Sequence, residues 1–305
     1  MASPFFIRNF VASKHKTMNT IQTFQELRER VSAHSKPHRI VAVKPEDEAS
    51  KAALQQVKDE GLAEVITVDN DVPEAAAQEA VALVRLGKGD VLMKGLIGTD
   101  QLLRAVLNKE AGLLPPGHVL THISAFELPN YPKMLFVTDV AVIPYPTQEQ
   151  RVEQVRYATT LCRSMGIGEP RVALIHCAEH GGKQFPFVDG YADIRRMAEE
   201  GAFGPCLVDG PLDVKTACSI EALKAKRMTS PLEGSSDVLV MPDIEAGNTF
   251  YKAMTLFTPA RSAGLMVGAS APVVIPSRGD DADAKFNSIL LALASLNVDC
   301  NATLG

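Results

Sequence analysis

The sequence predicts an α/β protein in which helices cover both faces of a mostly parallel sheet. From His38 onward, short runs rich in Val and Ile alternate with longer runs of helical periodicity. Repeated β-α units of this kind build parallel sheets with helices on either side. The chain has 305 residues, whereas one domain takes about 150. The length therefore favours two domains, and the stiff Pro144-Tyr145-Pro146 segment is the clearest break between them.

The first part of the chain is predicted to fold as β-α units. Strands are expected at 38–44, 63–69 and 91–94, and helices at 45–60, 73–86 and 99–110. Pro45 and Pro73 each open a helix, because proline is tolerated in a first turn. Gly61 and Gly87 close the same two helices. Thr99 is the expected N-cap of the third helix, since its hydroxyl can accept from a free backbone N–H.

The pattern changes after residue 120. Two strands, His122–Leu128 and Lys133–Asp139, are separated only by Pro129-Asn130-Tyr131-Pro132. This spacing fits an antiparallel hairpin inside an otherwise parallel sheet. A long helix is expected to follow from Thr147 to Met165.

The alternation then resumes to the end of the chain. Strands are expected at 171–177, 206–208, 237–241, 264–267 and 272–275, and helices at 189–200, 214–227, 246–257 and 282–296. Ligands of open α/β sheets bind beyond the carboxyl ends of the strands. The residues that directly follow strands are therefore the first candidates for a site: Lys94-Gly95, 176–180, Asp209-Gly210-Pro211, 243–248 and Ser277-Arg278-Gly279.

Composition excludes several classes of protein. Hydrophobic residues make up 46% and charged residues 22%, which is enough apolar material for a core and excludes a fully disordered chain. The net charge of −5 disfavours a general nucleic-acid binder, which is usually basic. No apolar run reaches the ~18 residues of a membrane-spanning helix, so no contact with a membrane is expected.

The cysteines and the first 17 residues give information about the cellular compartment of the protein. The 5 cysteines form no CxxC pair, which predicts reduced thiols and a cytoplasmic protein. Cys177 and Cys206 fall in apolar strands and are expected to be buried packing residues. Residues 1–17 carry basic but no acidic residues. They are a poor secretory signal; the favoured interpretation is a flexible extension, and the alternative is a transit-like segment.

Ser277-Arg278-Gly279 is the sharpest of the candidate motifs. It follows an apolar strand and is expected to open a helix, whose free N–H groups and positive dipole end suit a phosphate. Arg278 adds a two-pronged donor, Ser277 adds a hydroxyl, and Gly279 allows close backbone approach. The alternative is a plain N-cap beside a surface arginine.

A second candidate segment runs from Pro242 to Asn248. Asp243, Glu245 and Asn248 converge after a strand, and Tyr251-Lys252 lie on the helix that follows. Ordinary turn chemistry explains the same residues equally well, because Asp, Gly and Asn are common in turns.

Three further residues are weaker candidates. His176 and His180 have the i,i+4 spacing of a zinc pair, but His176 ends a strand and no HExxH motif or third ligand is present, so no metal site is expected. Lys94 could meet an anion or be a solvated loop lysine. The sequence also lacks GxGxxG, GxxxxGK[ST] and GxSxG motifs, which leaves nicotinamide, phosphate-loop and hydrolase chemistry unsupported.

Taken together, the segments resemble the phosphate acetyl/butyryltransferase family, most closely its butyryl-transferring members. The matching segments follow the family's order from about residue 38 to the last helix. They are 93–97 (MKGLI), 122–127 (HISAFE), 135–139 (LFVTD), 208–212 (VDGPL), 230–234 (SPLEG), 241–248 (MPDIEAGN) with Tyr251-Lys252, and 271–274 (APVV) before Ser277-Arg278. Each motif is weak alone, but the ordered set is specific.

The resemblance implies a reaction and an architecture. The family interconverts an acyl-CoA plus phosphate with an acyl phosphate plus CoA, and its fold resembles that of isocitrate and isopropylmalate dehydrogenases. Two three-layer α/β domains would flank a cleft, the first formed by 1–145 plus 270–305 and the second by 146–269. CoA, acyl-CoA and phosphate are the implied partners, with no further cofactor. A homodimer or higher homo-oligomer is expected.

The resemblance also assigns roles to individual residues. Arg278 and the helix N-terminus would clamp phosphate, and Ser277 would donate to the phosphate or to the carbonyl oxyanion. The remaining phosphate or substrate contacts are expected from Lys94, Asp243, Asn248, Lys252 and Gly279, and the CoA or acyl contacts from His176, Asp209 and Gly247.

The resemblance leaves a choice of acids for the group that accepts the CoA thiol proton. Many acetyl-type members carry an acid-acid pair in the helix after the Ser-Arg, and the second acid is the usual candidate base. Ala284 stands at that second place here, so Asp283, which matches the first acid, becomes the expected base. Asp280 and Asp281 are the alternatives, and all three could simply be acids of a helix first turn.

Three other functions remain as alternatives. A phosphate acetyltransferase would differ only in acyl length. A metal-dependent decarboxylating dehydrogenase of the same fold would need clustered Asp ligands and a nicotinamide site. A non-catalytic CoA- or acyl-phosphate-binding protein would not need the Ser277-Arg278 and 243–252 set.

Overall fold

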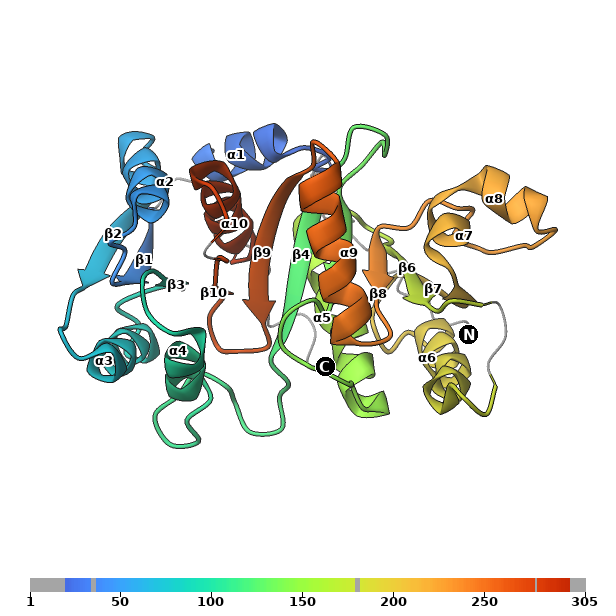
Figure 1. Ribbon diagram of the computed structural model, residues 1–305, viewed down its shortest axis with the longest axis horizontal. Helices are drawn as coiled ribbons and strands as arrows, with labels where there is room; N and C mark the ends of the chain where they lie inside the picture. Colours follow the sequence, from blue (N-terminus) through green and yellow to red (C-terminus); the bar gives the residue numbers. More distant parts are fainter. Residues whose placement is uncertain (1–19, 34–36, 179–181, 278, 297–305) are drawn as a thin grey trace, which may run out of the picture.

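The strands of the protein form one continuous sheet in the computed structural model, which describes residues 20–33, 37–178, 182–277 and 279–296. The sheet has 10 strands in the order β2-β1-β3-β10-β9-β4-β5-β8-β6-β7 (Figure 1). The strands are β1 (His38–Val43), β2 (Ala63–Val68), β3 (Val91–Lys94), β4 (Thr121–Glu127), β5 (Leu135–Thr138), β6 (Arg171–Ile175), β7 (Leu207–Leu212), β8 (Val238–Val240), β9 (Arg261–Val267) and β10 (Val273–Val274).

Helices connect most of these strands. They are α1 (Phe24–Ser32), α2 (Glu48–Asp59), α3 (Pro73–Arg85), α4 (Thr99–Val106), α5 (Gln148–Ser164), α6 (Gly190–Glu199), α7 (Val214–Cys218), α8 (Ile220–Ala225), α9 (Ile244–Phe257) and α10 (Ala282–Ser295), with a short 3₁₀ turn, η1 (Pro186–Asp189), before α6. No helix among these described residues is long and apolar enough to cross a membrane.

Strand direction changes in the middle of the sheet. β2, β1, β3 and β10 run parallel to one another, as do β5, β8, β6 and β7. The expected hairpin is confirmed, because β4 and β5 are antiparallel with Ile123 opposite Thr138. β9, which was expected to be parallel, is antiparallel to both β4 and β10. A short link joins β9 to β10, whereas a parallel neighbour would need a crossover of a dozen or more residues.

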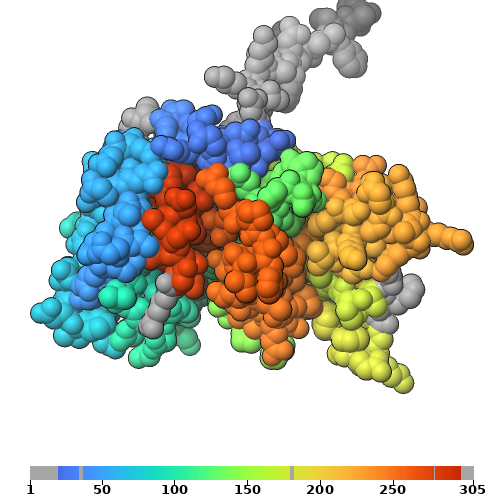
Figure 2. Space-filling view, turned by 45° about the horizontal axis from the view of Figure 1, so that its top comes forward, coloured from blue at the N-terminus to red at the C-terminus, as the bar shows by residue number. Residues whose placement is uncertain are grey.

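Helices cover both faces of the sheet, as the alternating pattern predicts. Ile40 and Ala42 pack on one face, in the core shared by α1, α2, α5, α6 and α10. Val41 and Val43 point to the other face, where α3 and α4 cover one half of the sheet and α7 and α9 the other. α1 and α2 both contact α10, and their blue surfaces adjoin the red surface of α10 in Figure 2.

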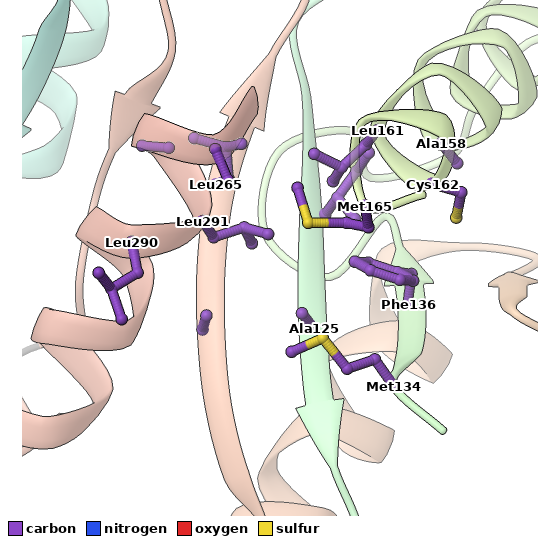
Figure 3. Packing of buried hydrophobic residues seen from close by; sticks show 14 of the residues in the cluster. Ala125, Met134, Phe136, Ala158, Leu161, Cys162, Met165, Leu265, Leu290 and Leu291 are labelled. Atoms are coloured by element: carbon purple, nitrogen blue, oxygen red, sulfur yellow. The ribbon is translucent and has the colours of Figure 1, made fainter. Parts of the chain in front are cut away.

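The larger core lies where α10 and α5 meet over β9 and β4. Leu291 of α10 and Leu161 of α5 are buried there together with Ala125, Phe136 and Leu265 (Figure 3). Burying such side chains contributes roughly 1.5–3 kcal/mol each, so this region holds the two halves of the sheet together.

Several expected element bounds need correction. β7 extends to Leu212, so Asp209-Gly210-Pro211 lie within a strand and not after one. Gly98, not Thr99, is the N-cap of α4. The helix expected at 214–227 is broken at Ser219, whose side chain caps α8 by accepting from the Ala222 N–H.

Two sequence signals were also missed or misjudged. The Thr23 and Glu26 capping box of α1 is present in the sequence, but no helix was expected before His38. Cys177 is exposed and Cys206 half-buried, so neither is the buried packing residue that was expected. Cys177 lies beyond the last residue of β6, where the strand no longer shields it.

The predicted division into two domains stays a prediction. β5 of the expected first domain pairs with β8 of the second, and β9 pairs with β4, so the sheet is continuous across the expected boundary. The segment 1–17, expected to be an extension, lies outside the described residues.

Candidate active site

A cavity of about 200 Å³ lies between α9 and the loop that precedes α10. Its floor is formed by β4 and β9, and its walls come from segments that are far apart in the sequence. The lining residues are Thr99, His122, Val140, Ala141, Asn248, Tyr251, Lys252, Ser262, Ala263, Gly264, Met266, Ile275, Pro276, Ser277, Asp280, Ala284 and Ser288. A larger, more open groove near α3 and the loop after α4 contains none of the predicted site residues, so the chemistry points to the smaller cavity.

Ser277 forms one wall of this cavity through a tight loop. Its backbone N–H donates to Oδ2 of Asp280 at 2.8 Å, and the Gly279 N–H donates to its Oγ at 3.4 Å. Arg278, the expected phosphate clamp, lies outside the described residues.

The helix N-terminus is not free for an anion in the way the sequence suggested. α10 begins at Ala282, and the Asp281 side chain is its N-cap, accepting from the Ala284 N–H at 2.8 Å. A capping carboxylate already satisfies this donor. Any phosphate bound here would therefore depend on side chains and on the loop before the helix.

Asp280 is the acid that faces the cavity. Burial raises the pKa of its carboxyl group, although the Ser277 N–H, Lys252, Lys285 and Tyr251 act in the opposite direction. The Tyr251 hydroxyl donates to Asp280 Oδ1 at 3.5 Å, and burial raises the pKa of Tyr251 to about 12. Tyr251 is therefore a neutral donor over the whole useful pH range.

Helix α9 supplies the opposite wall. Asn248 donates from Nδ2 to the Val140 carbonyl oxygen at 3.0 Å, and the exposed Lys252 has its Nζ 5.1 Å from the centre of the Tyr251 ring. Gly247 allows α9 to approach the loop after β5, because a Cβ at Gly247 would collide with the carbonyl oxygen of Asp139. Gly247 is thus a packing residue, not a cavity residue.

Asp139, which is 2% exposed, shapes the wall at Val140 and Ala141. Its Oδ1 accepts from the backbone N–H groups of Ala141 at 2.7 Å and Val142 at 2.9 Å. Its Oδ2 accepts from the Thr121 hydroxyl at 2.8 Å. The sequence offered Asp139 only as part of a resembling motif, and its structural task was not expected.

The floor of the cavity holds a histidine that sequence reasoning did not select. His122 is 6% exposed. Burial lowers its pKa, against the effect of the Asp139 carboxylate. Its Nδ1 is enclosed and has no hydrogen-bond partner among the described residues. Its place in the 122–127 motif was the only signal that could have found it.

Several predicted site residues lie elsewhere. Asp283 is exposed and does not line the cavity, whereas Ala284 does. Asp243 is the N-cap of α9, accepting from the Ala246 N–H at 2.8 Å. Lys94 is buried, and its Nζ donates to the Gly95 carbonyl oxygen at 3.1 Å. Gly279 is exposed beside the cavity.

The two polar residues expected to contact CoA lie at the far edge of the sheet. His176 is buried against the rings of Phe185 and Phe187, with ring centres 4.7 Å and 5.8 Å away, and burial lowers its pKa. Asp209 pairs with Arg195 at 3.3 Å. Neither lines the cavity that contains Ser277. His180 lies outside the described residues, and the described part of the chain contains no cluster of three metal-binding side chains.

Comparisons with known proteins agree on one family. The family model described as "Phosphate acetyl/butaryl transferase" matches residues 70–293. A phosphate butyryltransferase of Clostridium acetobutylicum is 36% identical over 295 residues, covering 89% of this chain and 97% of that protein. A phosphate acetyltransferase of Thermotoga maritima is 36% identical over 220 residues, covering 72% of this chain and 74% of that protein.

A solved structure supports the same assignment. The crystal structure of a branched-chain phosphotransacylase from Enterococcus faecalis is 30% identical in sequence and matches with a TM-score of 0.74. The match covers 85% of this chain and 99% of that chain, which confirms the predicted α/β fold. The chain therefore belongs to the phosphate acetyl/butyryl transferase family and is a phosphate acyltransferase.

Proposed function

We propose that this protein transfers a short acyl group between coenzyme A and inorganic phosphate, and that it prefers butyryl-CoA to acetyl-CoA. The observation that carries the proposal is the meeting of Ser277, Asn248 and Lys252 in one cavity. Their hydroxyl, amide and ammonium groups are hydrogen-bond donors that suit an anionic phosphate. Membership of the family supplies the class of reaction.

The transfer proceeds directly when both substrates occupy the cavity together. A phosphate oxygen attacks the thioester carbonyl carbon, the carbonyl oxygen gains negative charge, and the carbon–sulfur bond then breaks to release CoA. Ser277 and Lys252 hold the phosphate, together with Arg278, which the family resemblance assigns to the same anion. Holding the two reactants in line removes the entropy cost of their encounter.

Asp280 handles the proton of the CoA thiol in this mechanism, in place of Asp283. In the reverse reaction the thiol gives its proton to the carboxylate as sulfur attacks the acyl phosphate and the bond from the acyl carbon to the phosphate oxygen breaks. The carboxyl group then passes this proton to the released phosphate. In the forward reaction hydrogen phosphate supplies the proton, and the same carboxyl group delivers it to the leaving thiolate. Asp280 lines the cavity, and burial raises the pKa of its carboxyl group above the usual value, which makes the carboxyl group a better proton acceptor.

The preference for butyryl-CoA rests on the apolar part of the cavity and on the butyryl-type motifs. Ala263, Met266, Val140 and Ile275 are apolar residues that line the cavity. One methylene group in an apolar pocket contributes about 1–3 kcal/mol. The two extra methylenes of butyryl over acetyl should therefore raise kcat/KM on the order of tenfold or more.

The test is release of free CoA from acetyl-, propionyl- and butyryl-CoA, with and without phosphate. We expect release that depends on phosphate and is fastest with butyryl-CoA. Equal release without phosphate would indicate a thioesterase and contradict the transfer reaction. A clear preference for acetyl-CoA would leave the reaction standing and contradict the butyryl preference.

A further inference from the structure

His122 occupies an unusual position for a packing residue. It lies on the floor of the cavity, is 6% exposed, and its Nδ1 has no partner among the described residues. Burying a polar nitrogen without a hydrogen bond costs about 1–3 kcal/mol. An apolar side chain of similar size would avoid this cost, so packing alone gives no reason for a histidine here.

The other ring nitrogen of His122, Nε2, lies on the side of the cavity. Nε2 lies beside Gly264, which also lines the cavity: a Cβ at Gly264 would be 2.8 Å from Nε2 and 3.0 Å from Cε1. Strand β9 therefore has no side chain at the point where the ring approaches it. Since Nδ1 is the enclosed nitrogen, Nε2 is the one left on the cavity side.

The ring is also in a suitable state to donate a hydrogen bond. Burial lowers the pKa of His122, so the imidazole is neutral at neutral pH and carries one N–H. A neutral imidazole can stabilise a developing oxyanion without carrying a positive charge that would compete for the phosphate.

We propose that His122 is a catalytic residue that donates a hydrogen bond from Nε2 to the carbonyl oxygen of the acyl group. This inference rests on the proposed acyl transfer. The bond strengthens as the carbonyl oxygen becomes an oxyanion, and the proton stays on the imidazole while the carbon–sulfur bond breaks. The apolar residues near Gly264 then surround the acyl chain.

Substitution separates this role from simple packing. His122→Phe keeps a ring but has no donor, and we expect kcat to fall about 10²-fold or more with little change in the KM for phosphate. His122→Gln, whose amide can donate from a similar position, should recover part of the loss. Ser124→Ala is the matched control. Ser124 is buried on the same face of β4 and its Oγ has no partner, but it does not line the cavity.

The outcomes distinguish this inference from the proposed function. If the wild-type protein releases no CoA in response to phosphate, the acyl-transfer proposal fails. If the wild-type protein is active and a folded His122→Phe variant keeps its kcat, the role of His122 is wrong. A Ser124→Ala variant with the same loss as His122→Phe would also contradict it, because the effect would then come from packing of the strand.

A spectroscopic measurement covers the case in which His122→Phe does not fold. The probe is a butyryl-CoA analogue in which a methylene group replaces the thioester sulfur, so that the carbonyl group remains but cannot react. In protein labelled with ¹⁵N-histidine, one imidazole N–H signal, absent in His122→Gln, should move downfield when the analogue binds. An unmoved signal at saturation with the analogue would overturn the proposal.

Discussion

At the residue scale, two acids near the start of α10 differ in what surrounds them. Asp280 lines the cavity and is held by the Ser277 N–H and the Tyr251 hydroxyl. Asp283, only one helical turn further along the chain, is exposed and does not line the cavity. Sequence position favoured Asp283 as the base. Asp280, however, is the acid whose pKa is raised by burial.

The proposal that Asp280, and not Asp283, is the base gives the first prediction. Asp280→Asn should lower kcat for CoA acylation at pH 7 by about 10²-fold. The loss should be smaller at pH 9, because a free thiol with a pKa of about 8.5 ionises there without help. Steady-state kinetics at both pH values check this. Asparagine can still accept from the Ser277 N–H, so the loop itself should persist.

Asp283→Asn is the matched control for this prediction. It removes the same charge from the neighbouring turn and should leave kcat at both pH values close to wild type. A loss in Asp283→Asn with full activity in Asp280→Asn would restore the assignment that the sequence suggested.

At the element scale, the position of α9 depends on one glycine. A Cβ at Gly247 would collide with the Asp139 carbonyl oxygen, and backbone atoms cannot rotate aside as a side chain can. We predict that Gly247→Ala lowers the free energy of unfolding by about 1–3 kcal/mol, the usual cost of overpacking. It should also lower kcat/KM, because α9 carries Asn248 and Lys252. Denaturant unfolding and kinetics measure the two effects.

The control for Gly247→Ala is Gly168→Ala. A Cβ at Gly168 meets no atom within 4 Å. The free energy of unfolding of this variant should equal that of the wild type to within about 0.5 kcal/mol, the usual scatter of surface substitutions. If both variants were equally stable, close contact between α9 and the loop after β5 would not hold in solution.

A partly buried ion pair fixes the start of α2 against α10. Lys285, which has a 5% exposed side chain, donates from Nζ to Asp47 Oδ1 at 2.5 Å and to Ser50 Oγ at 3.1 Å. Burial alone would raise the pKa of Asp47, but the hydrogen bonds from Lys285 and Ser50 outweigh it and lower the pKa to about 2. Asp47 also caps α2.

This ion pair predicts a dependence of stability on pH. The folded pKa of Asp47, about 2, lies below the unfolded value of about 3.9. The stabilisation is therefore present above about pH 4 and is lost as the pH falls toward 2. Asp47→Asn keeps an N-cap but removes the charge. We expect the free energy of unfolding of this variant to be lower than that of the wild type at pH 7. The difference between the two should shrink from pH 4 to pH 2, and urea unfolding at each pH measures it.

If the free energies of unfolding of the wild type and Asp47→Asn differed by the same amount at every pH in this range, the prediction would be contradicted. Glu48→Gln is the control, because Glu48 lies next to Asp47 and its side chain is 91% exposed in its pair with Lys51. Exposed pairs of this kind contribute little, so the stability of Glu48→Gln should follow that of the wild type at each pH.

At the scale of the whole molecule, the cavity exists because the sheet is continuous. β9 and β4 lie at its centre and form the floor, and the walls come from α9 on one half and from the β10–α10 loop on the other. Residues 122, 251 and 277 are far apart in sequence and meet only there. The reaction proposed for this cavity uses side-chain donors and one carboxyl group, with no step that needs a metal ion.

The corresponding prediction concerns metal removal. Phosphate-dependent CoA release should survive EDTA, because the described residues around the cavity offer a single carboxylate, that of Asp280, and no set of three metal ligands. The assay compares untreated and EDTA-treated protein at the same ionic strength. Complete loss of activity, restored by one added metal ion, would contradict the mechanism.

Local signals in the sequence were sufficient for most elements. Proline and glycine marked the ends of α3, the spacing around Pro129 predicted the β4–β5 hairpin, and the period of two along β1 divided its side chains between two cores. The direction of β9 was not predictable in this way. Its own residues suit a buried strand in either direction, and pairing with β4 and β10 decides between them.

The sequence by itself determined the fold class and the family, and it predicted that Ser277, Asn248 and Lys252 lie close together, as they do in the cavity. These depend on periodicity, on turn chemistry and on an ordered set of motifs, all of which are local. Only the tertiary structure places Asp280 in the cavity and Asp283 outside it, brings His122 to the cavity floor, and places Asp209 and His176 near the far edge of the sheet. Burial and the absence of a hydrogen-bond partner arise from contacts between distant segments, and no local pattern encodes them.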